Sequence, residues 1–208
     1  MARLDINSFA AQLKSGGARP NLFRAQLTAP QLIRGELFPN ETFSFLCKAA
    51  QLPASTVGVV PIPFRGRILK VSGDRTFADW TITVISDSAW TMRSQFEMWS
   101  NAINSYVSNQ SRLGSPNVLS FDQYTGNATV AQLDREGTEV AAYLLEGIWP
   151  TEVAAIDLSY ESTDQIEEFT VTFAMQYFTP STMDIIPRFT ATDIGSTLAQ
   201  ANDVFGSL

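Results

Sequence analysis

The strongest constraint in this sequence is a nine-residue segment in which apolar and polar side chains alternate strictly. From Phe169 to Tyr177, every second residue is large and apolar, and the residues between them are small or polar. A period of two places one set on each face of a β-strand. The segment therefore predicts a strand with a buried face formed by Phe169, Val171, Phe173, Met175 and Tyr177.

Further alternating segments predict that most of the chain is β-structure. Weaker versions of the pattern lie between Gly, Pro, Asn and Asp residues, which favour turns. Strands are predicted at residues 22–28, 42–48, 80–85, 118–124, 127–133, 140–149 and 152–160, with a turn at 134–137 and another at 150–151. This pattern is typical of a mainly β domain with one buried face on each strand.

One segment has the repeat of an amphipathic helix. From Met92, apolar residues recur at Phe96, Trp99, Ile103 and Tyr106/Val107. Asp87 or Ser88 could cap its start. The spacing predicts a helix of about five turns that covers an open face of the sheet, with Arg93 and Glu97 as a pair on its outer side.

The two ends of the chain differ from the middle. Residues 1–19 are predicted to be an N-terminal arm with a short helix, because Ile6, Phe9, Ala10 and Leu13 have helical spacing. Residues 20–179 form the β-domain, and residues 180–208 form a tail that docks on a neighbour or stays flexible.

Several classes of catalyst are excluded by composition. The chain has no histidine and a single cysteine, Cys47, so a Ser-His-Asp triad or a thiolate zinc cluster cannot form. Cys47 lies in an apolar run and is predicted to be a buried small hydrophobe. Glu167 and Glu168 would point to opposite strand faces. No enzyme activity, cofactor or metal is predicted, and a β-sandwich carboxylate-dependent hydrolase is kept as a distant alternative.

The sequence shows no sign of membrane insertion or secretion. No apolar run reaches the ~18 residues of a membrane span, and the first residues do not resemble a signal peptide. A soluble protein made in a reducing cytosol is therefore expected.

Charge is distributed unevenly along the chain. The net charge is −7, yet residues 1–112 carry 12 basic and 7 acidic side chains, whereas residues 113–208 carry 2 and 14. The 11 arginines outnumber the 3 lysines, which favours bidentate pairing with carboxylates.

The basic residues are concentrated in one segment. Arg65 and Arg67 are predicted to share one strand face, and Gly66 between them suggests a bulge or a close backbone approach. A protein–protein salt-bridge surface is favoured over a DNA-binding module that uses Arg65, Arg67, Lys70 and Arg75. Asp157 is predicted to alternate away from the core and to face water or a partner.

Short motifs follow one another in a fixed order over roughly residues 16–178. They are Gly16–Phe23, Lys48–Pro53, Pro63–Arg67, Gly73–Phe77, Phe96 with Trp99, Ile103 and Asn104, Gln132–Asp134, Ala155–Tyr160 and Ile166–Phe169. In these motifs the chain resembles the tail tube proteins of contractile-tailed (T4-like) bacteriophages, and their order and spacing make the resemblance specific.

The resemblance implies two packed antiparallel sheets, as a sandwich or partial barrel, flanked by one α-helix. Six copies would close into a ring whose inner strands form one continuous β-barrel, and rings would stack into a tube. The implied function is a structural tail tube subunit in the virion, assembled in the host cytoplasm. Genomic DNA would pass through without specific binding. The implied partners are other copies of the chain and the sheath, baseplate and tail terminator proteins. The inner tube of a contractile bacteriocin or secretion-type system is the near alternative.

Two sets of residues are candidates for these roles. The predicted subunit interface consists of Arg65, Arg67, Lys70, Asp74, Arg75 and Asp157. The predicted lumen-facing residues are Glu168, Thr170, Thr172 and Gln176, with Ala174 between them, because this strand face is small, polar and free of positive charge. An ordinary solvent-facing surface is the alternative.

Overall fold

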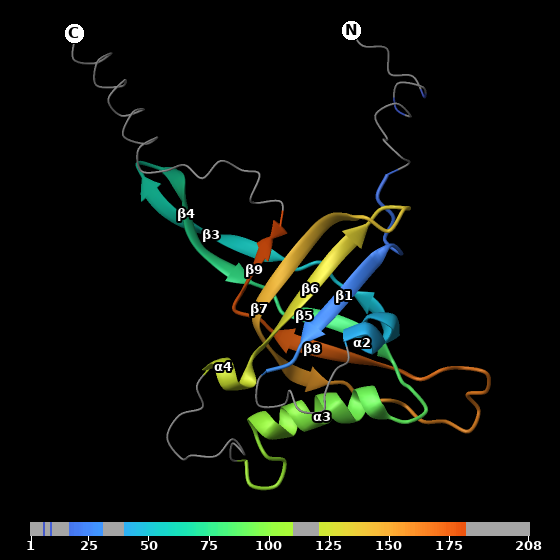
Figure 1. Ribbon diagram of the computed structural model, residues 1–208. Coiled ribbons are helices and arrows are strands. Elements are labelled where there is room, and N and C mark those ends of the chain that lie inside the picture. Colours follow the sequence, from blue (N-terminus) through green and yellow to red (C-terminus); the bar gives the residue numbers. More distant parts are fainter. Residues whose placement is uncertain (1–5, 7–8, 10–16, 31–39, 110–120, 182–208) are drawn as a thin grey trace.

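A computed structural model of the protein describes residues 6, 9, 17–30, 40–109 and 121–181. From residue 17 onward, this part of the chain forms nine strands and three helices (Figure 1). In chain order they are β1 (Phe23–Thr28), α2 (Asn40–Leu46), β2 (Cys47–Ala50), β3 (Ser55–Phe64), β4 (Arg67–Phe77), β5 (Trp80–Ile85), α3 (Thr91–Ile103), α4 (Phe121–Tyr124), β6 (Gly126–Leu133), β7 (Glu139–Val153), β8 (Glu168–Ala174) and β9 (Tyr177–Pro180).

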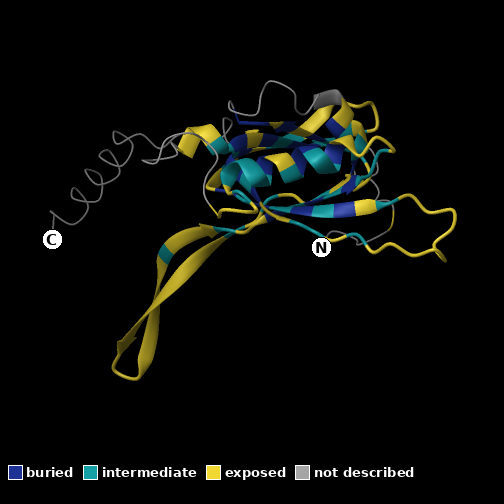
Figure 2. Cartoon of the chain, turned by 90° about the horizontal axis from the view of Figure 1, so that it is seen from below, coloured by how far each residue is buried: buried dark blue, intermediate teal, exposed yellow. Residues whose placement is uncertain are grey.

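Two antiparallel sheets share strand β7. The strands follow the order β1-β6-β7-β8-β5-β2, and β9 also pairs with β7. The first part of β7 pairs with β6 and β9, and its last residues, from Trp149 to Val153, pair with β8. The expected mainly β fold with antiparallel sheets is therefore confirmed. Strands β3 and β4 form a separate hairpin that projects from the body (Figures 1 and 2).

Gly147 allows β7 to pass from one sheet to the other. Its φ is +64°, and a Cβ atom there would lie 2.8 Å from Gln176 Cγ and 2.8 Å from Phe121 Cζ. The position therefore needs both the conformational freedom and the small size of glycine.

Strand β7 is longer than the sequence predicts. The expected turn at Pro150 is wrong, because the strand continues to Val153. The ladder with β8 has a register shift between Pro150 and Glu152, an irregularity of the kind that tolerates the missing N–H of proline. The predicted strand at 152–160 is wrong beyond Val153, because residues 154–159 contain no strand.

Aromatic side chains from strands and helices form the core between the sheets and α3. The ring centroids of Phe96 and Phe173 are 6.0 Å apart, and those of Trp99 and Phe173 are 6.1 Å apart. The Trp99 side chain is fully buried, and its Nε1 donates a hydrogen bond of 2.8 Å to the Tyr124 carbonyl oxygen. Helix α3 thus supplies part of the core.

Helix α3 is confirmed but shorter than predicted. The N-cap position of α3 is Trp90, which makes no side-chain capping bond, rather than the predicted Asp87 or Ser88. Asp87 nevertheless serves the start of the helix, because its Oδ1 accepts hydrogen bonds from the backbone N–H groups of Thr91 and Met92, at 2.9 and 3.2 Å. The helix ends at Ile103, and Tyr106 and Val107 are exposed.

Two predicted strands are partly helical. Residues 40–46 form α2, and only Cys47 and Lys48 of the predicted strand at 42–48 belong to a strand. Phe43 and Cys47 are buried, whereas Phe45 is 85% exposed, so burial follows a helical spacing of four. In the predicted strand at 118–124, Phe121–Tyr124 form α4, and the ring centroids of Phe121 and Tyr124 are 5.7 Å apart. Residues 118–120 lie outside the described part.

Other alternating segments are strands as predicted. The described apolar faces of β1, β5, β6 and β8 are buried, and Asp134 Oδ1 closes the predicted turn by accepting from the N–H groups of Glu136 and Thr138. Strand β8 ends at Ala174, however, and Tyr177 starts β9 with its side chain partly exposed.

The predicted terminal elements fall mostly outside the described residues. Of the expected N-terminal helix, Ile6 and Phe9 are described, and both are exposed. Ala10, Leu13 and residues 182–208 lie outside. Among the helices that the structure describes, none combines the length and apolar character needed to cross a membrane.

Candidate assembly surfaces

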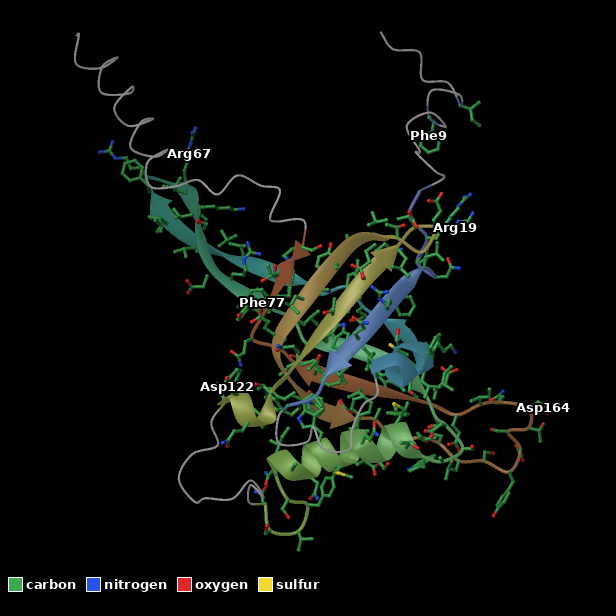
Figure 3. All side chains as sticks on the ribbon, in the orientation of Figure 1. Phe9, Arg19, Arg67, Phe77, Asp122 and Asp164 are labelled. Atoms are coloured by element: carbon green, nitrogen blue, oxygen red, sulfur yellow. The ribbon has the colours of Figure 1, made fainter. Side chains whose placement is uncertain are left out.

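Strands β3 and β4 form a long projecting hairpin, residues 55–77, which we call the arm. Its ladder runs from the pair Ser55–Phe77 to the pair Phe64–Arg67. Arg65 and Gly66 form the turn, with φ values of +43° and +82°, as a tight two-residue hairpin turn requires. The expectation that Arg65 lies on a strand face with Arg67 is therefore wrong, because Arg65 lies in the turn. Arg67 is the first residue of β4 and lies at the tip of the arm (Figure 3).

The irregularity predicted at Gly66 lies instead in the middle of the arm. The ladder shifts register between Val57 and Val59. There, Gly58 faces the backbone of Gly73 and Asp74, and a Cβ on Gly73 would lie 3.2 Å from the Gly58 carbonyl oxygen. Two glycines thus allow the strands to approach closely at a bulge.

Both faces of the arm are exposed, which the sequence patterns did not predict. Figure 2 shows almost the whole hairpin as exposed. Eight large apolar side chains of the arm are between 41% and 66% exposed: Val57, Val59, Val60, Ile62, Phe64, Ile68, Leu69 and Val71. Apolar and polar residues do not alternate from Val57 to Phe64, and the segment contains two prolines. Both features indicate that the segment is not a central strand of a sheet.

The base of the arm is fixed to the body. The Phe77 ring packs edge-on against Phe178 of β9 with centroids 5.5 Å apart, and Phe178 packs against Tyr143 of β7 at 6.1 Å. The Ala78 N–H donates to the Ala54 carbonyl oxygen at 3.0 Å. The arm therefore has a defined origin and a tip that lies away from the body (Figure 1).

The predicted interface residues of the arm lie together on this projection. They are Arg65, Arg67, Lys70, Asp74 and Arg75, and all are exposed. Arg75 Nη1 donates a 2.7 Å hydrogen bond to Ser55 Oγ, and the Arg65 guanidinium lies 5.5 Å from the Phe64 ring centroid. None of these charges forms an ion pair with another described residue, so they are available to a partner.

Asp157, the remaining predicted interface residue, lies elsewhere, in the 154–167 loop. It is exposed as expected, but in a loop rather than a strand. The ends of this loop are fixed, because the Ala154 N–H donates to the Thr170 carbonyl oxygen and the Ser86 N–H to the Glu167 carbonyl oxygen, both at 2.9 Å. In Figures 1 and 3 the loop, with Asp164 labelled, extends on the side of the body opposite to the arm.

The 154–167 loop combines exposed apolar side chains with acids. Leu158, Tyr160 and Ile166 are 77%, 107% and 72% exposed. Residues 155–162 and 165–168 line a cavity of about 940 Å³. The sequence predicts Asp157 of this surface as an interface residue, but the alternating motif Ala155–Tyr160 wrongly predicts a strand instead of a loop.

The predicted lumen residues are divided between a strand face and a loop. Glu168, Thr170 and Thr172 share the outer face of β8, where Thr170 and Thr172 lie opposite Thr83 and Thr81 of β5. Lys48 Nζ and Glu168 Oε1 form an ion pair at 2.5 Å. Ala174 ends β8 on the same face, but Gln176 is exposed beyond the strand, where its N–H donates to the Glu146 carbonyl oxygen at 3.2 Å.

The environment of Cys47 agrees with the prediction of a buried hydrophobe. The side chain is 5% exposed, and burial raises the pKa of its thiol to about 12. The thiol is therefore uncharged at neutral pH and unsuited to nucleophilic or metal chemistry. Among the described residues, no three His, Cys, Asp or Glu side chains are grouped so that they could hold a metal ion.

Solved structures from contractile systems share this fold. A chain of the anti-feeding prophage baseplate superposes with a TM-score of 0.57 at 14% identity, covering 78% of this chain and 94% of that chain. A chain of the sheath–tube complex of the extracellular contractile injection system PVC gives a TM-score of 0.56 at 12% identity, covering 82% and 96%.

Comparison of sequences identifies the family, whereas the structural matches show only the fold. Over 162 residues the chain is 35% identical to the tail tube protein gp19 of Enterobacteria phage T4, covering 77% of this chain and 90% of that protein. It is 23% identical over 167 residues to the tail tube protein of Serratia phage KSP90, covering 79% and 90%. The family model described as phage tail tube protein matches residues 18–181. The chain therefore belongs to the phage tail tube protein family.

Proposed function

We propose that this tail tube protein assembles into six-membered rings that stack into a hollow tube, and that the phage genome passes through the tube during ejection. The arm is the observation that carries the proposal. A two-stranded ribbon is marginally stable by itself, and this one exposes eight large apolar side chains on a projection from the body. Exposed apolar surface of this kind is typical of an interface with another chain.

Among the described strands, the edges of the sheets support association through strands. The strand order ends in β1 on one side and in β2 on the other. Unpaired edges invite pairing with another chain, and closure into a barrel removes them. Six copies joined edge to edge would give each ring a continuous inner barrel.

The outer face of β5 and β8 is the proposed lumen wall. Its central positions are Thr81, Thr83, Thr170 and Thr172, which carry no charge. Lys48, the cation beside them, is already paired with Glu168. Such a wall offers little to DNA phosphates, whose binding depends on free Lys and Arg, so DNA would pass without being held.

The proposed partners follow from the complexes in which chains of similar structure were solved. Chains with this fold come from complexes described as a baseplate, a sheath–tube complex, a sheath/tube terminator and a tube-terminating cap. We infer that sheath, baseplate and terminator proteins bind this tube in the virion. An injection-system tube is the second candidate, because those neighbours include one. The family match and the identity to gp19 favour the phage.

Electron microscopy of the purified full chain, alone and with tail-assembly partners, tests this function. We expect hollow tubes or stacked rings with six-fold end views. A matched variant replaces residues 58–74 by Asn-Gly, which closes the ribbon at the pair Val57–Arg75. It should keep the β-rich circular dichroism spectrum and form no tubes.

Two results would contradict the proposal. A wild-type chain that stays monomeric in every condition would overturn the tube function. A density map in which the outer face of β1 and β6 lines the channel would overturn the assignment of the threonine face alone.

A further inference from the structure

We propose that the arm of one copy docks onto the 154–167 loop of a neighbouring copy. The inference rests on the proposed self-assembly and names the two surfaces that meet. The occupant of the loop is therefore a second copy of this chain, and its contact residues are those of the β3–β4 hairpin.

Charge complementarity is the first argument. The arm carries Arg65, Arg67, Lys70 and Arg75 against the single acid Asp74. The loop contains four acids and no basic residue: Asp157, Glu161, Asp164 and Glu167. None of these acids forms an ion pair with another described residue. Opposite potentials of this kind orient two surfaces and exclude wrong partners.

The second argument is that both surfaces are apolar between their charges. At the tip of the arm, Phe64 and Ile68 are 66% and 65% exposed beside the two arginines. In the loop, Leu158 and Ile166 are exposed beside a cavity of about 940 Å³, which the acids Asp157, Glu161 and Glu167 help to line. Apolar side chains of the tip can enter this cavity while the guanidinium groups reach carboxylates at its rim.

Both ends of the loop are held on the body. Arg93 Nη1 of α3 donates to the Ala154 carbonyl oxygen at 2.9 Å, and the Ser86 N–H donates to the Glu167 carbonyl oxygen at 2.9 Å. A receptor loop whose ends are already held loses less conformational entropy on binding than a free segment.

Because the arm and the loop lie on opposite sides of the body, two copies cannot form a symmetric dimer in which each arm docks on the other copy's loop. Figures 1 and 2 place the arm and the loop on opposite sides of the body, and the labels of Arg67 and Asp164 mark them in Figure 3. A contact between two different surfaces is heterologous, so after one contact the first copy still has a free loop and the second copy still has a free arm. Such contacts close into rings or propagate along a stack.

Charge-reversed variants of the full chain provide the test. The arm-reversed variant carries Arg65→Glu and Arg67→Glu, and the loop-reversed variant carries Asp157→Lys and Glu161→Lys. All four side chains are exposed, so circular dichroism should show folded protein. In each variant alone the reversed side chains meet groups of like charge: the reversed arm meets Asp157 and Glu161, and the reversed loop meets Arg65 and Arg67. The yield of sedimented tubes should therefore fall about tenfold or more. Arg135→Glu, in the exposed turn after β6, is the matched control and should assemble normally.

Mixing the two variants gives the decisive measurement. In a 1:1 mixture the two Glu side chains of a reversed arm can pair with the two Lys side chains of a reversed loop, and each unchanged arm can pair with an unchanged loop, so tubes of alternating subunits should form. Normal assembly of the arm-reversed variant alone, or failure of the mixture, would overturn the arm–loop contact while wild-type tubes still support the proposed function. Absence of wild-type tubes would instead overturn the proposed function, and this inference with it.

Discussion

Arg93 joins helix α3 to the start of the 154–167 loop, because its Nη1 donates a 2.9 Å hydrogen bond to the carbonyl oxygen of Ala154. Its Nε also contacts Glu97 Oε1 at 2.8 Å, and its guanidinium lies 5.4 Å from the Phe169 ring centroid. The sequence predicted only a surface pair between Arg93 and Glu97. The side chain is 14% exposed and is part of the packing.

We expect Arg93→Gln to destabilise the unassembled protein by about 1–3 kcal/mol, since the change leaves the Ala154 carbonyl oxygen without its charged donor. Urea unfolding followed by tryptophan fluorescence would measure the difference. Arg135→Gln removes the same type of side chain from an exposed turn and should change stability by no more than about 0.5 kcal/mol. Equal values for the two variants would show that the Arg93 contacts contribute nothing.

Trp99→Ala should cost about 3–5 kcal/mol, because the side chain is fully buried against Phe173 and its truncation leaves a cavity. Met98→Ala is the matched control on the same helix, with a side chain that is 49% exposed. Thermal or urea unfolding of both variants would give the comparison. A melting temperature unchanged by Trp99→Ala would contradict the described core.

Gly147→Ala should destabilise the protein more than Gly137→Ala. Both glycines have positive φ, +64° and +84°, so both variants incur the backbone cost of about 1–2 kcal/mol. A Cβ at Gly137 meets nothing within 4 Å, whereas one at Gly147 meets Gln176 and Phe121 at 2.8 Å. We expect an additional cost of about 1–3 kcal/mol at Gly147, measured by urea unfolding. Equal costs would show that the shared strand does not need a small residue there.

Cys47 should make the protein less stable at alkaline pH. Burial raises the pKa of the thiol from 9.0 to about 12, so between these values the unfolded chain loses a proton that the folded chain keeps. The free energy of unfolding therefore falls as pH rises from about 9 towards 12, by up to about 1.4 kcal/mol per pH unit from this group. Below pH 9 the contribution is constant.

Comparison with Cys47→Ala isolates this effect, because the lysines and tyrosines titrate in both proteins. The difference in unfolding free energy between wild type and variant should shrink as pH rises through that window. In the folded wild type, a thiol reagent at pH 8 should react slowly until urea is added. A pH-independent difference would contradict the raised pKa.

Predictions from the sequence succeeded where one face of a strand packs on the core. In β5 and β8 the buried residues alternate with threonines, so burial follows the sequence period directly. The strand prediction for residues 42–48 was wrong. Phe43, Phe45 and Cys47 fit the period of two of a strand, but Phe43 and Cys47 also fit the spacing of a helix. The tertiary contact decides between them, since Phe43 packs against Phe96 with ring centroids 6.4 Å apart.

The candidate surfaces were predicted in part. The charged residues of the arm lie together in the structure because they are close together in the sequence, and their role as a subunit interface stays a prediction. The projection of the arm could not be predicted from the sequence. Valine and isoleucine favour strands whether the strand is buried or exposed, so their presence does not distinguish a projecting hairpin from a strand inside a sheet. For the 154–167 loop the sequence predicted an exposed Asp157 but the wrong conformation, since alternation alone does not require that a segment pairs with a neighbouring strand.

The connection of the arm to the body has a mechanical consequence. Phe77 at the base of the arm contacts Phe178 in β9, and β9 is hydrogen-bonded to β7, the strand shared by both sheets. A pull on the arm is therefore transmitted to the strand with the most ladder partners rather than to a single loop. Hydrogen bonds of several strands would resist it together, so the proposed arm–loop contact would place load on the sheets rather than on one strand.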